Sequence, residues 1–146
     1  MTITFSAESG TSTSITITVH DLGALVEEVH RLTNVERTNA GLPQFGRNQP
    51  LIQTAVVRAN EIIQYFSHTR PDGRSCFTAF EENHVEYRHA GENLAAGQRS
   101  AAEAVQSWMD SQGHRENIMN RDFGQMGVGV VMDNDGRIYW TQTFTD

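Results

Sequence analysis

The chain has 146 residues, of which 38% are hydrophobic, and a formal net charge of −7 at pH 7. This length suits one domain with a hydrophobic core, and no apolar run reaches the roughly 20 residues that a membrane-spanning helix needs. The acidic balance and the scattered basic residues exclude a nucleic-acid partner, because phosphate contacts need a basic patch.

The first 20 residues differ from the rest in pattern. Residues 2–5 and 14–19 alternate polar and apolar side chains, which is typical of half-buried strands, and the Ser/Thr/Gly-rich residues 6–13 predict a turn between them. We therefore predict a β-hairpin or strand extension over residues 1–20, followed by the main domain over residues 21–146. The N-terminus lacks the basic and apolar regions of a signal peptide, so we expect a mature form or a piece of a longer exported protein.

Helical periodicity dominates the next segment. Asp21 is the predicted N-cap of a first helix, which the Gly-Leu-Pro sequence of residues 41–43 ends. A second apolar stripe predicts a helix that ends near His68, and a short helix is expected over residues 75–82. Cys76, the one cysteine, is expected to be a buried small residue; a thiol activated by the helix N-terminus is the alternative.

The second half combines extended segments with helices. Glu92 lies in a predicted strand, and Ser100 begins a helix, because a glutamate follows it at capping-box spacing. A single helical turn is expected over residues 114–119. Residues 125–132 and 137–144, on either side of an Asp-Asn-Asp-Gly turn, predict an antiparallel hairpin.

Short motifs follow one another in the last 80 residues: Phe66-Ser67-His68 with Arg70-Pro71-Asp72-Gly73, Gly91-Glu92-Asn93, Trp108 with Gly113-His114-Arg115, Gly127-Val128-Gly129, and Tyr139-Trp140-Thr141-Gln142. In this order they resemble the bacterial branch of the CAP superfamily, the SCP-like extracellular proteins, over about four fifths of the chain. The resemblance implies an α/β (α+β) fold, an α-β-α sandwich in which helices flank a small, mainly antiparallel sheet. It also implies a secreted or cell-surface location.

The resemblance further implies a central cleft. His68 and His114 match the two histidines of the family, and Glu92 matches the glutamate of its Gly-Glu-Asn motif. Two neutral imidazoles can bind a divalent metal, with zinc favoured, and Glu92 would add a third ligand or polarise a bound water. Many eukaryotic relatives have a second glutamate where this chain has Ser111, with Asp110 beside it, and we include both as cleft residues. The alternative is that these side chains satisfy buried backbone groups and no metal is bound.

Three functions remain open from the sequence. The first is an extracellular module that binds a small molecule, a lipid or an extracellular protein through the cleft. The second is a metal-assisted, peptidase-like hydrolase in which Glu92 is the catalytic general base. The third is a purely structural surface domain. Whether the protein is an enzyme is therefore not decided by the sequence, because fold alone does not determine activity.

Overall fold

The computed structural model describes the backbone of residues 2–7 and 13–146, and side chains from Asp21 onward. It begins with two strands, β1 (Thr2–Ala7) and β2 (Thr13–Thr18), which pair in antiparallel register. The predicted strand pair is thus confirmed, and most of the predicted turn falls on residues 8–12, outside the described residues.

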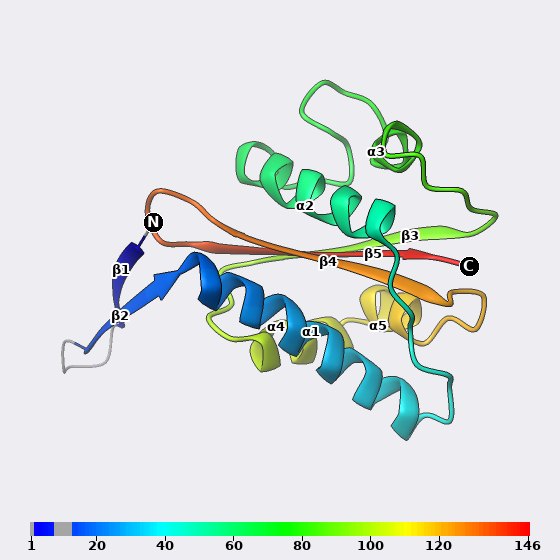
Figure 1. The fold of residues 1–146 in the computed structure, drawn as a ribbon, viewed down its shortest axis with the longest axis horizontal. Coiled ribbons are helices and arrows are strands. Elements are labelled where there is room, and N and C mark those ends of the chain that lie inside the picture. The colour runs from blue at the N-terminus through cyan, green and yellow to red at the C-terminus, as the bar shows by residue number, and fades with distance from the viewer. Residues whose placement is uncertain (1, 8–12) are drawn as a thin grey trace.

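The remaining described chain is a three-layer sandwich (Figure 1). Strands β3 and β4 both pair antiparallel with β5, so the order in the sheet is β3-β5-β4. Helices α2 and α3 cover one face, while α1, α4 and α5 cover the other, as the α-β-α prediction requires. The elements are α1 (Val19–Asn39), α2 (Gln49–Gln64), α3 (Phe77–Glu82), β3 (Ala90–Ala96), α4 (Ala101–Met109), α5 (Gln112–Ile118), β4 (Gln125–Met132) and β5 (Ile138–Thr145).

Helix boundaries follow the predictions with two corrections. Helix α1 begins two residues before Asp21, which lies in its first turn; an acidic residue is favourable there as well as at the cap, so the residue type alone does not locate the start. Helix α2 ends before Tyr65, whose backbone is extended, and not at His68. The predicted stop at Gly41 (φ 76°) is confirmed, as is the cap at Ser100, which accepts a 3.1 Å bond from the amide three residues later.

Helix α2 lies unusually close to the sheet. A Cβ atom on Gly127 would lie 2.4 Å from the carbonyl oxygen of Leu51, and one on Gly129 would lie 2.4 Å from that of Ala55. Thr141 of β5 donates a 2.7 Å hydrogen bond to the same Ala55 carbonyl. Side chains larger than hydrogen would separate helix and sheet, so the two glycines set the position of α2 and of every side chain it carries.

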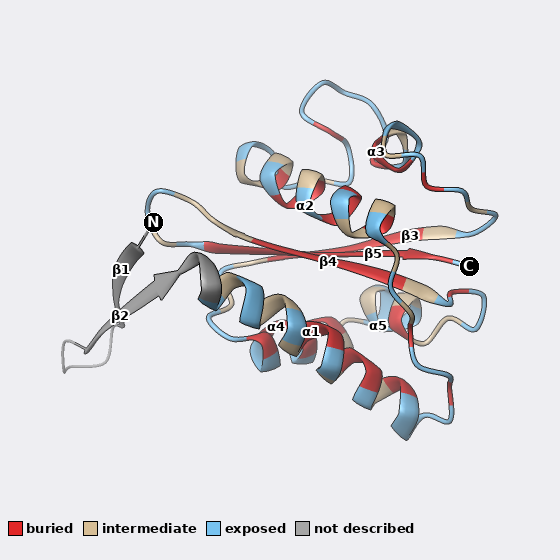
Figure 2. Ribbon diagram, viewed as in Figure 1, coloured by how far each residue is buried: buried red, intermediate tan, exposed pale blue. Residues whose placement is uncertain are grey.

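The opposite face of the sheet holds the main hydrophobic core. Trp108 of α4 and Trp140 of β5 are buried there, and each indole N–H donates to a backbone carbonyl, of Leu94 and Gln98 respectively. Figure 2 shows buried residues along the sheet and on the sides of the helices that face it. None of the described helices is both long enough and apolar enough to cross a membrane.

Candidate functional site

The site is built on Glu92, which β3 directs toward α2. Its side chain is only 1% exposed, and Arg58 of α2 binds both of its oxygens: Nε donates to Oε2 at 2.7 Å and Nη2 donates to Oε1 at 3.0 Å. The Arg58 side chain is fully buried. A buried carboxylate is stable only when it is paired and hydrogen-bonded, and this bidentate contact provides both.

His68 lies against the same carboxylate. Its Nδ1 is 3.0 Å from Oε1 of Glu92, while the ring is 60% exposed. An ionised carboxylate only accepts hydrogen bonds, so Nδ1 carries the proton of this contact; in the neutral form of the ring, Nε2 then has the lone pair. Arg58 also donates to the carbonyl oxygen of Ser67 at 2.6 Å. One guanidinium thus holds both the carboxylate and the backbone next to His68.

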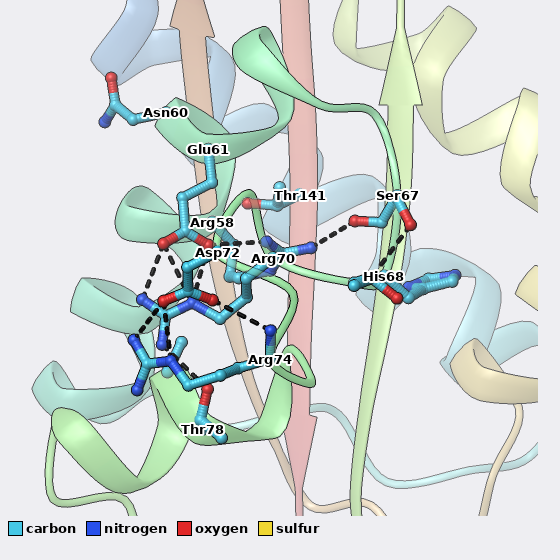
Figure 3. A network of polar contacts seen from close by, with 12 residues as sticks. Arg58, Asn60, Glu61, Ser67, His68, Arg70, Asp72, Arg74, Thr78 and Thr141 are labelled. Atoms are coloured by element: carbon cyan, nitrogen blue, oxygen red, sulfur yellow. Dashed lines mark hydrogen bonds and ion pairs between the residues drawn. The ribbon is translucent and has the colours of Figure 1, made fainter.

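A chain of ion pairs holds the segment that carries His68 (Figure 3). Glu61 of α2 accepts bonds of 2.7 Å from both Arg58 and Arg70, and Arg70 also binds Glu82 of α3 at 2.6 Å. Arg70 is 7% exposed, and its bonds to the two glutamates raise its pKa despite partial burial. The segment between α2 and α3 is therefore tied to both helices, which restricts where His68 can move.

His114 lies on α5, half-buried, with Nδ1 2.9 Å from the hydroxyl oxygen of Ser111. Burial lowers its pKa, and the proximity of His68 lowers it further, so the neutral ring is favoured. This coupling indicates only that the two imidazoles, 46 residues apart in sequence, are close enough in the fold to interact electrostatically.

Asn93 connects the strand of Glu92 to the helix of His114. Its amide nitrogen donates to the carbonyl of His114 and to Oε1 of Gln142, both at 3.1 Å. Its amide oxygen accepts a 2.9 Å bond from Asn117, also on α5. Asn93 is fully buried, so water does not compete for its hydrogen bonds. These bonds hold α5 against β3, an edge strand of the sheet.

The predicted cleft residues do not all come together. His68 contacts Glu92, and His114 contacts Ser111. Asp110 caps the C-terminus of α4, and its carboxylate accepts a 2.8 Å bond from Gln106 instead of turning toward a histidine. Ser111, which stands where many eukaryotic relatives have a second glutamate, therefore offers His114 a hydroxyl group and not a carboxylate.

Two residues of the site were missed by the sequence interpretation. Arg58 occupies the apolar stripe of α2 formed by Leu51, Ala55 and Ile62, and a charged residue in such a stripe is the signal that identifies it. Cys76 is 4% exposed, as expected for a small buried residue, but its sulfur belongs to a cluster with ligand atoms of His68 and Glu92. Burial, with Glu92 as the second cause, raises the pKa of the Cys76 thiol to about 11, which is opposite to activation by a helix N-terminus.

Known proteins resemble this chain over most of its length. Residues 30–144 match the cysteine-rich secretory protein family, CAP. YkwD of Bacillus subtilis is 38% identical over 125 residues, covering 84% of this chain and 48% of that protein. YlbC of the same organism, named as a membrane protein, is 35% identical over 120 residues, covering 81% of this chain and 33% of that protein.

A solved structure agrees in fold. An extracellular protein with an SCP domain from Bacillus anthracis has a TM-score of 0.79 and 27% identity, over 92% of this chain and 46% of that one. The chain spans about half or less of the length of each of these relatives. The similarity therefore concerns one domain of the longer proteins.

Proposed function

Because this chain belongs to the cysteine-rich secretory protein (CAP) family, we propose that it is an extracellular module that binds a ligand or partner at a site formed by His68, Glu92 and His114, where the two histidines hold a divalent metal, zinc in preference. We call these three residues the histidine site. The partner bound at the histidine site would be a small molecule, a lipid or an extracellular protein.

The observation that carries the proposal is the hydrogen bond between His68 and buried Glu92. Metal-binding histidines characteristically bond a carboxylate, carbonyl or water through the nitrogen that does not bind the metal. His68 has this arrangement, and His114 has an equivalent one through the Ser111 hydroxyl. Nε2 of His68 is thus left for a metal, and so is Nε2 of His114 when Ser111 accepts the hydrogen bond; the lowered pKa of His114 favours the neutral form that a metal requires.

Glu92 would act through His68 and not as a ligand or a base at this site. Oε2 accepts from Arg58, and Oε1 accepts from Arg58 and His68, so neither oxygen is directed at a substrate. This arrangement weighs against the hydrolase alternative, in which Glu92 takes a proton from water. A binding module is the function that these contacts support best.

Zinc titration of metal-free protein by isothermal calorimetry tests the proposal. We expect one zinc per wild-type molecule, and affinity reduced at least about tenfold in His68→Ala and in His114→Ala. His84→Asn is the matched control, because His84 is exposed and its φ of 62° is one that asparagine tolerates. Equal zinc affinity in all four proteins, or none in any of them, would reject the metal and favour a structural surface domain.

The extracellular location is part of the same proposal. Its support is the similarity to an extracellular SCP-domain protein at 27% identity. Fractionation of the native host, with detection of this domain by antibody, tests it. We expect the domain in the medium or on the cell surface, and recovery in the cytosol alone would contradict the proposal.

A further inference from the structure

Cys76 lies on the inner side of His68, where the proposed function gives it no role. We propose that Cys76, His68 and Glu92 form an inner metal site, which uses the other nitrogen of His68 and therefore takes one ion in place of the one shared by His68 and His114. The thiol sulfur, a ring nitrogen and a carboxylate oxygen lie within 4.8 Å of one another. Among the residues that the structure describes, no other three histidine, cysteine or acidic side chains cluster in this way.

The spacing suits a small divalent ion after a modest contraction. Three atoms within 4.8 Å of one another leave a central point no more than about 2.8 Å from each, whereas zinc binds nitrogen at about 2.0–2.1 Å and sulfur at about 2.3 Å. Each ligand atom would therefore move by roughly 0.7 Å at most. The exposed His68 ring can make this movement, since Glu92 is the one side chain in the described part of the protein to which it forms a hydrogen bond.

The inner site would use the Nδ1 side of His68, which faces Glu92. The ion replaces the proton of the Cys76 thiol, which passes to the buffer, while the proton of the neutral His68 ring moves from Nδ1 to Nε2. Oε1 of Glu92, which accepts the His68 bond, becomes the oxygen ligand, and Oε2 keeps its 2.7 Å bond from Arg58. No oxidation state changes, so the step needs no other reactant.

The surrounding charges are compatible with an added cation. The Glu92 carboxylate and the Cys76 thiolate together offset two positive charges. Arg58 remains compensated, because its Nη1 also donates to Glu61 at 2.7 Å. The combination of sulfur, nitrogen and one carboxylate oxygen favours zinc or cobalt over magnesium and calcium, which prefer oxygen ligands alone.

Access would run past the His68 ring. Cys76 is 4% exposed and the Glu92 side chain 1%, whereas the His68 side chain is 60% exposed. A metal would enter as this ring turns outward and would be shielded when it returns. Such shielding favours slow release of the ion, because the ligands must separate before water reaches it.

Titration of the metal-free protein with Co²⁺, followed by absorption, tests the inner site. A thiolate ligand gives an intense charge-transfer band in the near ultraviolet, which histidine and carboxylate ligands do not give. We expect this band in wild type and in His114→Ala, and its complete loss in Cys76→Ser. Serine keeps the size and the hydrogen-bonding ability of cysteine, and circular dichroism would confirm that the variant is folded.

The results separate this proposal from the histidine site. Cobalt bound without the charge-transfer band in wild type would overturn the inner site and leave the His68–His114 site standing. A band that persists in His114→Ala would support the inner site, and the calorimetric comparison of His114→Ala with wild type decides separately whether His114 binds a metal. Absence of any cobalt binding to wild type would overturn both.

Discussion

Arg58 and Glu92 form a bidentate ion pair in the interior, with bonds of 2.7 and 3.0 Å and side chains no more than 1% exposed. The pair joins α2 to β3. It also orients His68, because Oε1 of Glu92, which Arg58 holds in place, contacts Nδ1 of His68. Removing two charges from water is costly, and the further bonds of Arg58 to Glu61 and to the Ser67 carbonyl offset part of that cost. Folding and the proposed function therefore depend on the same contact.

Removal of Arg58 alone should be strongly destabilising. We expect Arg58→Met to lower the free energy of unfolding by about 3–5 kcal/mol, because Glu92 is left buried and unpaired. The double variant Arg58→Met, Glu92→Leu should recover much of this loss. Urea denaturation of the three proteins measures it, and an Arg58→Met protein as stable as wild type would show that the pair is not important for folding.

The contact between α2 and the sheet should tolerate no side chain at Gly129. We expect Gly129→Ala to cost about 1–3 kcal/mol or more, since its Cβ would lie 2.4 Å from the Ala55 carbonyl oxygen. Gly113→Ala on α5, which meets nothing within 4 Å, is the control and should be neutral or stabilising. Thermal unfolding compares the two, and similar midpoints would contradict close packing.

The buried side chain of His30 should make stability fall in mild acid. Burial lowers its pKa, and Arg47 lowers it further, while Glu27 acts in the opposite direction. The folded pKa lies below the unfolded value of about 6.5, so the unfolded chain binds more protons as the pH falls below 6.5. This one group destabilises the fold by at most about 1.4 kcal/mol per pH unit, until the pH passes the folded pKa.

Chemical denaturation between pH 7.5 and 5 would measure the effect of His30. In His30→Gln the decrease in stability toward low pH should be shallower than in wild type. His84→Asn, which replaces an exposed histidine, should keep the wild-type slope. Parallel curves for wild type and His30→Gln would mean that His30 does not contribute.

Loss of Asn93 should weaken zinc binding although Asn93 is not a ligand. Its amide holds the His114 carbonyl and Gln142, and its oxygen holds Asn117. We expect Asn93→Ala to cost about 1–3 kcal/mol of stability and to reduce zinc affinity by loosening α5. Asn60→Ala removes an exposed asparagine of α2 and should change neither quantity. Unchanged calorimetry for Asn93→Ala would disprove the positioning role.

Much of the fold was predictable because local patterns and the family motifs point the same way. The apolar stripe of α2, the Ser100 cap and the C-terminal hairpin are confirmed. The start of α1 was not predictable from Asp21, since an acidic residue suits either the cap or the first turn. The pairing of β3 and β4 with β5 depends on contacts distant in sequence, and the family resemblance, not periodicity, indicated the sandwich.

The site was predictable in part. The contact between His68 and Glu92 agrees with the motif-based expectation, whereas their roles as a metal site stay predictions. Arg58 was missed because helical periodicity assigns only apolar residues to the core. It does not indicate that a charged residue of α2 forms a buried ion pair with Glu92 of β3. Cys76 was missed as a neighbour of His68 because the turn between them, which brings the two together, has no periodic signature.

The position of β5 has a consequence for how the domain is made. It is the last strand in chain order and yet the middle one, so β3 and β4 each depend on it for their pairing. During synthesis both strands remain with unpaired backbone edges, which favour aggregation, until residues 138–145 are added. A chain that ends before Ile138 would therefore be unable to form the β3-β5-β4 sheet at all, because it lacks the strand that pairs with both of the others.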